Sequence, residues 1–243
     1  MIPTSTLFKD LLESGDYYVE TVLSVNDTPP DESYAENILM SVHTTKKVFS
    51  QDIPAVGGVI AGEISVEMLM PEQPIPRMAK LSPYVRLRNL EKTRYTEWIP
   101  KGSYYLDTRK KVEDTAGAIR LQIRGYDSIM KTEQDYPESK LSFPARDLDV
   151  VQEIADFIGV RLDGRTKDVM QNAYQVEDVT GYTFREVLGY IAAMYGGNFV
   201  MSDRGALWLV AMGDASADDE VETNYLINET RNVITFGGDR ILV

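Results

Sequence analysis

The amino-acid sequence predicts an α+β protein, with a mainly antiparallel β-barrel or sandwich domain followed by a smaller α+β module that holds two helices and a β-hairpin. Three observations support this class. Apolar and polar residues alternate along residues 63–70 and 119–124, which is typical of strands that bury one face. After Asp127 the apolar spacing changes to the intervals of amphipathic helices. Pro, Gly and Asp residues separate the strand-like runs of the first part, as turns do in small β domains.

The chain divides near this change of periodicity. Its 243 residues, 43% of them hydrophobic, suffice for a buried core and suggest one large domain or two smaller ones. Residues 1–130 carry a net charge of −3 and residues 131–243 a net charge of −10. We therefore expect a barrel-like domain with an N-terminal helix over residues 1–130 and an α+β module over residues 131–225. Residues 226–243 are expected to return strands to the barrel or to start a second one.

The first domain is expected to begin with a short helix that follows Pro3 and stops at Gly15. The apolar face of this helix consists of Leu7, Phe8, Leu11 and Leu12. Less regular strand-like runs occupy residues 17–25, 83–90, 95–99 and 103–108. Together with the two alternating segments they give roughly four to six strands, enough for a small antiparallel barrel or sandwich.

The second module is expected to contain two helices and a hairpin. The first helix ends at Gly159, and its apolar stripe consists of Leu148, Val151, Ile154, Ala155 and Ile158. The second helix begins at Thr183, whose spacing to Glu186 is that of a capping box, and stops at the Gly-Gly pair 196–197. Residues 198–211 then have the pattern of strand, turn and strand. Further strand-like runs lie at residues 232–236 and 241–243.

Composition excludes several classes of function. The formal charge of −13 disfavours bulk electrostatic attraction to nucleic acid. The chain has no cysteine, which removes disulfides, thiolate zinc sites and cysteine nucleophiles. Its one histidine, His43, cannot supply a zinc site with several imidazole ligands, and we interpret it as an ordinary surface or sheet histidine. No export signal and no apolar run of about 20 residues is present, so a cytosolic origin without membrane insertion is expected.

Common catalytic and nucleotide-binding motifs are missing. Gly57, Gly58 and Gly62 have the spacing of neither a dinucleotide fingerprint nor a P-loop. With 38 acidic residues, paired carboxylates of the glycosidase type arise too easily by chance to carry a prediction. The acidic run 214–222 lacks the spacing of an EF-hand, and we interpret it as a solvated loop rather than a calcium site. We therefore expect a protein that is not an enzyme and that uses no cofactor or metal.

A basic stretch interrupts this acidic background, because residues 77–124 carry 12 basic and 5 acidic side chains. Its polar strand faces hold the candidate residues for a subunit or partner interface: Arg86, Arg88, Arg120 and Arg124. Three interpretations remain open. The stripe is a solvated face with cross-strand partners such as Glu63 and Glu97, an interface that meets an acidic surface such as the acidic half of another subunit, or a nucleic-acid groove. The last lacks the interleaved aromatic residues of an RNA-binding platform.

Four segments follow one another in a characteristic order. A strand ends in LQIRGYDS at residues 121–128, and a helix contains DVVQEIA at residues 149–155. A second helix contains GYTFREVLGYIA at residues 181–192, and a strand follows in GALWL at residues 205–209. In this order the segments resemble the tail hub (baseplate hub, tail-associated) proteins of phages and prophages, and the resemblance covers most of the chain.

The resemblance implies a structural role. Hub proteins of this kind form a trimeric ring that closes the end of the tail tube, with two similar β-barrels per subunit. The implied partners are sister subunits, the tail tube protein and distal tail or tail-fibre proteins, in a virion tail assembled in the bacterial cytoplasm. The sequence departs from this pattern because a second barrel would start near Val233, where only eleven residues remain. We therefore expect either the N-terminal part of a longer hub protein or a protein without the second barrel.

Two alternative functions in a phage particle stay open. One is a cell-wall glycan hydrolase that uses two acidic residues of the second half. The other is a carbohydrate-binding module that uses exposed aromatic residues on strands, with Trp98, Tyr104 and Tyr105 as candidates. Aromatic residues at strand positions more often pack in a core or on a sheet surface, which favours the structural role.

Overall fold

A computed structural model describes most of the chain. Its contacts divide the chain into two units, Met1–Met212 and Gly213–Val243. The helices and the long strands belong to the first unit, and each unit is described by itself. The described residues are 4–35, 37–49, 54–113 and 119–212, with the backbone of 235–236 and 239–240.

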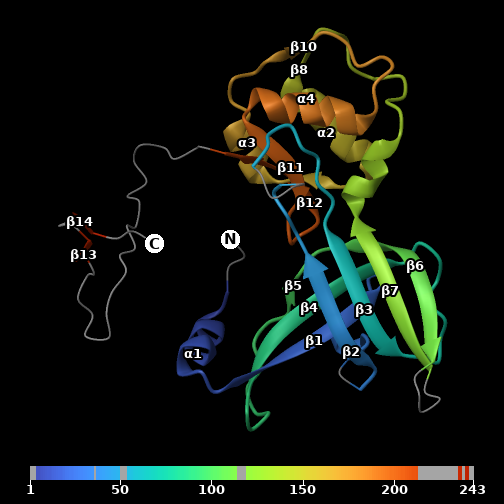
Figure 1. Cartoon of the computed structure of the whole chain (residues 1–243), viewed down its shortest axis with the longest axis vertical. Helices are drawn as coiled ribbons and strands as arrows, with labels where there is room; N and C mark the ends of the chain where they lie inside the picture. The colour runs from blue at the N-terminus through green and yellow to red at the C-terminus, as the bar shows by residue number, and fades with distance from the viewer. Residues whose placement is uncertain are drawn as a thin grey trace. The chain divides into compact units, whose positions relative to one another are not determined.

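The N-terminal part of the first unit is an antiparallel sheet. Its strands follow the order β1-β4-β6-β7-β3-β2, with β5 paired to β4 beside this path. Figure 1 shows the sheet as a curved layer from which the long strands β6 and β7 extend as a hairpin. The strands are β1 (Tyr17–Val25), β2 (Leu39–Thr45), β3 (Glu63–Leu69), β4 (Lys80–Asn89), β5 (Ile99–Pro100), β6 (Tyr104–Glu113) and β7 (Ile119–Asp127).

Alternating burial explains why the two most regular segments are strands. In β3, Ile64, Val66 and Met68 are buried, while the residues between them are more exposed. In β7, Leu121 and Ile123 are buried in the same way. Both predicted strands are confirmed, and their buried side chains pack in one hydrophobic cluster with Leu23, Leu81, Tyr104 and Leu106.

The sheet remains open in the part of the chain that the structure describes. Its strand pairs are all antiparallel, which confirms the predicted α+β class with a mainly antiparallel β region. No described ladder joins the edge strands β1 and β2, so the sheet does not close into a barrel there. Tyr34, in the connection between these strands, pairs instead with the edge of β1. Its carbonyl accepts a hydrogen bond from the Leu23 N–H at 2.8 Å.

A short helix, α1 (Thr6–Ser14), precedes the sheet as the sequence predicts. The Ser5 hydroxyl caps it by accepting a hydrogen bond from the Phe8 N–H at 3.1 Å. Gly15 ends the helix with a φ of 73°, a conformation that favours glycine. Of the predicted apolar face, Leu11 is buried whereas Leu12 is 52% exposed. The helix therefore contacts the sheet through a narrow stripe.

The rest of the first unit consists of three helices and several short strands. In Figure 1, α4 lies beside α2 and next to β11. None of the described helices is long and apolar enough to cross a membrane. The elements are η2 (Ser128–Glu133), β8 (Ala145–Arg146), α2 (Asp147–Ile158), β9 (Arg161–Leu162), α3 (Gly164–Val169), β10 (Gln175–Val176), α4 (Phe184–Met194), β11 (Gly197–Met201) and β12 (Ala206–Ala211).

The predicted helices and hairpin of this module are confirmed. Helix α2 ends at Gly159, which adopts a left-handed conformation. At the start of α4, the Thr183 hydroxyl accepts a hydrogen bond from the Glu186 N–H at 3.2 Å, and the Glu186 carboxylate accepts one from the Thr183 N–H at 2.8 Å. This is the capping box that the sequence predicts. β11 and β12 pair antiparallel around the predicted turn.

Some elements carry no clear signal in the sequence. Neither α3 nor β2, the strand that contains the exposed His43, is predicted from it. The predicted strand 95–99 is wrong over most of its length, because its last residue alone belongs to β5. The segment pairs with β4 only at isolated points: Tyr95 forms a bridge with Arg88, and the Thr96 N–H donates a hydrogen bond to the Leu87 carbonyl at 2.9 Å. The Thr96 hydroxyl accepts the next bond, from the Leu87 N–H, at 2.9 Å.

The described residues of the first unit form two hydrophobic clusters. One lies inside the curved sheet, and the other is formed by α2, α4 and the β11–β12 hairpin, with Ile154, Leu188 and Phe199 fully buried. Val59 belongs to the second cluster although it lies in the connection between β2 and β3. This connection therefore carries the chain from the sheet to the second cluster and back.

The structure describes a small part of the second unit. Two short strands, β13 (Thr235–Phe236) and β14 (Asp239–Arg240), pair antiparallel. β13 overlaps the predicted strand 232–236, and the predicted return of this region to a barrel stays a prediction. The predicted strand 241–243 and the acidic run 214–222, with its solvated-loop and calcium interpretations, lie outside the described residues.

Candidate functional site

The four arginines predicted to form an interface lie on two separate parts of the sheet. The described ladder between β4 and β6 covers only the first two residues of β4, which continues past β6 to Arg86 and Arg88. Arg120 and Arg124 lie in β7, between β3 and β6. The register therefore does not bring the four residues into one stripe, and each pair has its own surroundings.

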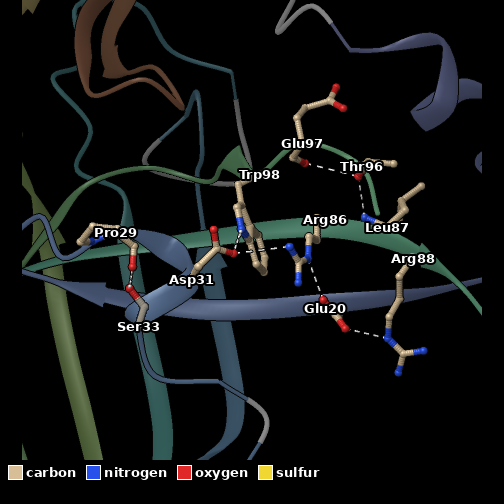
Figure 2. A network of polar contacts seen from close by, with 10 residues as sticks. All are labelled: Glu20, Pro29, Asp31, Ser33, Arg86, Leu87, Arg88, Thr96, Glu97 and Trp98. Atoms are coloured by element: carbon tan, nitrogen blue, oxygen red, sulfur yellow. Dashed lines mark hydrogen bonds and ion pairs between the residues drawn. The ribbon is translucent and has the colours of Figure 1, made fainter. Parts of the chain in front are cut away.

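Arg86 and Arg88 share one carboxylate, that of Glu20 in β1 (Figure 2). Glu20 lies opposite Arg86 in the register of β1 and β4. Its Oε2 is 2.7 Å from Nε of Arg86, and its Oε1 is 2.7 Å from Nε of Arg88. The Arg88 side chain is 8% exposed and that of Glu20 is 19% exposed, so the attraction is less screened than at an open surface. The two ion pairs join neighbouring strands of the same chain.

Arg86 also lies against two aromatic rings. Its guanidinium carbon is 4.5 Å from the ring centroid of Tyr95 and 4.2 Å from that of Trp98, which are cation–π distances. The Trp98 indole N–H donates a hydrogen bond to Asp31 at 2.9 Å, and the same carboxylate oxygen is 3.5 Å from Arg86 (Figure 2). Asp31 belongs to the short 3-10 helix η1 (Pro30–Glu32) after β1. The network therefore fixes η1 on the sheet.

Glu97, one of the partners predicted for the arginines, binds the N-terminal helix instead. Its carboxylate accepts hydrogen bonds from the N–H and the hydroxyl of Ser5, at 2.7 and 2.6 Å. Burial acts to raise the pKa of Glu97, but the hydrogen bonds from Ser5 produce a net lowering. Because Ser5 caps α1, this contact ties the start of the helix to the segment that follows β4.

The two arginines of β7 differ in their contacts. Arg120 Nη1 is 3.3 Å from Glu67 Oε1 in β3. Arg124 is exposed, lies opposite Ser65 and Thr108, and has no ion pair within the described part of the chain. Glu63, the other predicted partner, lies opposite Tyr126 rather than an arginine. Of the four candidates, Arg124 is thus the one whose charge is open to a partner.

The aromatic candidates for carbohydrate binding do not form an open platform. Tyr104 is fully buried in the sheet core. Tyr105 is half-buried, and Nζ of Lys131 lies 4.1 Å from its ring centroid. Trp98 packs on Arg86. Each of the three rings is thus either buried or has a cation over one face, which favours a packing role over sugar binding.

Asp127, at the end of β7, is the described carboxyl group whose pKa is raised. It is 2% exposed, and burial raises its pKa to about 6. Its two oxygens accept hydrogen bonds from the N–H groups of Gly62 and Ile129, at 2.7 and 3.0 Å. Both oxygens thus hold the main chain where the sheet leads into η2. No group of three or more histidine or acidic residues that could hold a metal ion occurs among the described residues.

A buried amide clamps the connection between β2 and β3. Asn198, in β11, is fully buried. Its amide oxygen accepts a hydrogen bond from the Gly58 N–H at 2.6 Å, and its amide nitrogen donates to the carbonyls of Val48 and Ala55 at 2.8 and 2.7 Å. A Cβ at Gly58 would lie 2.9 Å from that amide oxygen, so the close approach requires glycine. Packing against Asn198 thus explains the glycine at position 58, which belongs to no phosphate-binding motif.

Helix α4 holds the same connection from another side. The Arg185 guanidinium donates a hydrogen bond to the Val59 carbonyl, and its Nε is 2.6 Å from Glu133 Oε1. A Cβ at Gly189 would lie 2.9 Å from the Gly57 carbonyl oxygen, so the absence of a side chain lets the backbones approach. These contacts fasten the second cluster to the sheet through residues distant in sequence.

Comparison with known proteins relates this fold to tail proteins. No family model and no curated protein matches the sequence. The structure is similar to the 43 kDa tail protein of prophage MuSo2 from Shewanella oneidensis, with a TM-score of 0.50 and 14% identity over 80% of this chain and 56% of that one. It is also similar to a tail protein from Neisseria meningitidis MC58, with a TM-score of 0.48 and 14% identity over 79% of this chain and 50% of that one. A third similar structure is the Francisella PdpA-VgrG complex, with a TM-score of 0.43 and 8% identity over 79% of this chain and 31% of that one.

The first of these comparisons shows a shared fold. The similarity includes 80% of the chain, and the chain spans 56% of the length of the MuSo2 tail protein. At 14% identity, the two proteins share the arrangement of their helices and strands but few individual residues.

Proposed function

We propose that the protein is a non-enzymatic structural component of a phage or prophage tail. The observation that carries this proposal is the fold shared with the MuSo2 tail protein over 80% of the chain. The order of sequence segments, which resembles that of tail hub proteins, supports the same role. Two of the described carboxylates, those of Asp127 and Glu20, make internal contacts that fit a structural role.

In its finer form, the proposal makes the protein a subunit of a trimeric hub ring at the tail tip or baseplate. The ring joins the tail tube protein to distal tail or tail-fibre proteins, and it is assembled in the bacterial cytoplasm. The open sheet supports this form, because the part of the β1 edge that precedes Leu23 is joined by no described strand and can pair with a strand of a neighbouring subunit. A cavity of about 200 Å³ separates β1 from β2, and it is lined by Tyr18, Val19, Thr21, Leu39, Met40, Ser41 and Val42. Arg124 offers a charge to an acidic surface beside this sheet.

Light scattering across a range of protein concentrations tests the ring. We expect trimers, and we expect Val19→Lys on the β1 edge to weaken them. Val56→Lys is the matched control, because Val56 is 50% exposed and Val19 is 47% exposed, while Val56 lies in the connection between β2 and β3. A protein that stays monomeric at high concentration would argue against the ring. Equal weakening by the two substitutions would argue against the β1 edge as its contact.

A further inference from the structure

Two cavities border the turn between β11 and β12 in the first unit. One has a volume of about 480 Å³ and lies among the segment after β2, the end of β7, the start of α3 and the hairpin itself. The other has a volume of about 450 Å³ and lies among the starts of β4, β6 and η2 and the loop before β9. Arg204, in the turn, lines both cavities. The two cavities therefore adjoin at Arg204.

Basic side chains outnumber acidic ones around these cavities. The acidic residues are Asp127, Asp156, Asp163 and Asp203, and the basic residues are Lys46, Lys47, Lys80, Arg161, Arg165 and Arg204. Three of the basic side chains have partners. Lys46 is 2.5 Å from Asp203, Arg165 is 2.9 Å from Asp163, and Lys80 is 2.7 Å from Asp27.

The other three basic residues are Lys47, Arg161 and Arg204. They are exposed, and within the described ranges none of them has an ion pair or a side-chain hydrogen bond. In a chain with a net charge of −13, unpaired cations that line two adjoining cavities give this region a local positive excess. The region therefore has the charge and the concave shape to bind an extended anionic ligand.

The surrounding groups favour an acidic polypeptide over a nucleic acid. Single-stranded nucleic acids bind through bases that stack on open aromatic rings. Each of the two rings that line these cavities already has a cation over one face. Arg165 lies 3.5 Å from the ring centroid of Trp208, and Lys131 lies 4.1 Å from that of Tyr105. The lining carboxylates, such as Asp203, would repel a continuous phosphate backbone, whereas separate carboxylate side chains can be placed between them.

We propose that these two cavities form a docking site for an acidic segment of another protein, whose carboxylates pair with Lys47, Arg161 and Arg204. The proposal rests on the tail role only in placing that partner among the other tail proteins. Ring formation is tested at the β1 edge, and none of that edge's residues lines these cavities. Peptide binding and trimer formation can therefore fail independently of each other.

Fluorescence anisotropy with a labelled peptide of alternating glutamate and glycine tests the docking site at low salt. We expect it to bind at least about tenfold more tightly than the matched glutamine peptide, since paired charges set specificity. The triple variant Lys47→Gln, Arg161→Gln, Arg204→Gln should weaken binding by about tenfold. The control triple Arg77→Gln, Lys110→Gln, Lys111→Gln removes the same charge from exposed residues outside the cavities, which have no ion pair within the described part of the chain, and should keep the affinity within about twofold.

Several outcomes would overturn the docking site. Equal weakening by the two triple variants would assign binding to net charge. Tighter binding of single-stranded DNA of equal charge would assign the cavities to nucleic acid, and failure of the unmodified protein to bind the glutamate peptide would remove the site. Circular dichroism checks that both variants fold. Arg204→Gln alone, at a residue that lines both cavities, provides the same comparison if the triple variant unfolds.

Discussion

Replacing Glu20 with glutamine tests whether Arg86 and Arg88 stabilise the fold or are held ready for a partner. The substitution keeps the shape of the side chain but removes the charge shared by two guanidinium groups, each at 2.7 Å. The new amide also places its NH₂ group against the Nε–H of either Arg86 or Arg88, so that two hydrogen-bond donors face each other. An exposed ion pair contributes up to about 1 kcal/mol, and breaking a fully buried one costs about 3–5 kcal/mol. With Glu20 19% exposed and Arg88 8% exposed, we expect a loss of about 2–3 kcal/mol.

Urea unfolding followed by circular dichroism measures this loss. Glu63→Gln is the matched control, because Glu63 is an exposed strand residue without an ion pair in the described part of the chain, and its effect should stay within about 0.5 kcal/mol. A double-mutant cycle with Arg88→Met should show a coupling of about 1 kcal/mol or more. Equal effects of Glu20→Gln and Glu63→Gln would refute the internal role and return Arg86 and Arg88 to the interface interpretation.

Two further predictions concern the junction between sheet and helices. Asn198→Ala leaves one N–H and two carbonyl groups without their buried partner. We therefore expect the free energy of unfolding to fall by about 2–4 kcal/mol and proteolysis near Gly58 to become faster. Asn172→Ala, at an exposed residue, is the control and should change little. Asp127 has a pKa raised from 3.8 to about 6, so the folded state binds more protons than the unfolded state between these values. Its contribution to stability should fall by about 3 kcal/mol as the pH rises through that interval. Urea unfolding as a function of pH should show this fall, and Asp127→Asn should remove it; an unchanged pH profile in the variant would contradict the assignment.

The elements predicted correctly are those whose signal is local. The capping box at Thr183 and Glu186 lies within four residues, and the alternation in β3 and β7 needs no knowledge of the neighbouring strand. The predicted strand 95–99 failed because isolated contacts with β4, at Tyr95 and Thr96, take the place of a continuous ladder. Such isolated contacts leave no periodic pattern in the sequence.

The contacts that join the two clusters could not be predicted, because their partners are far apart in the chain. Asn198 meets Val48 and Ala55 across about 150 residues, and nothing near Asn198 in the sequence marks it as a clamp. Gly58 did carry a signal, but a glycine indicates close approach without naming what approaches. That the Asn198 amide is what approaches Gly58 becomes apparent only in the folded structure.

Charge counted along the sequence does not measure the charge of a surface. The basic excess of residues 77–124 suggests one stripe, yet Glu20 neutralises part of it from another strand and the register separates Arg88 from Arg124. Conversely, Lys47, Arg161 and Arg204 belong to no basic run, and the fold gathers them around two neighbouring cavities. A cation in an ion pair within the chain is largely neutralised by its partner, whereas an unpaired cation still attracts an acidic group of another molecule. Lys110 and Lys111 of the basic stretch are also exposed and without an ion pair among the described residues, so the two cavities, and not the missing ion pairs alone, distinguish Lys47, Arg161 and Arg204 as the proposed docking site.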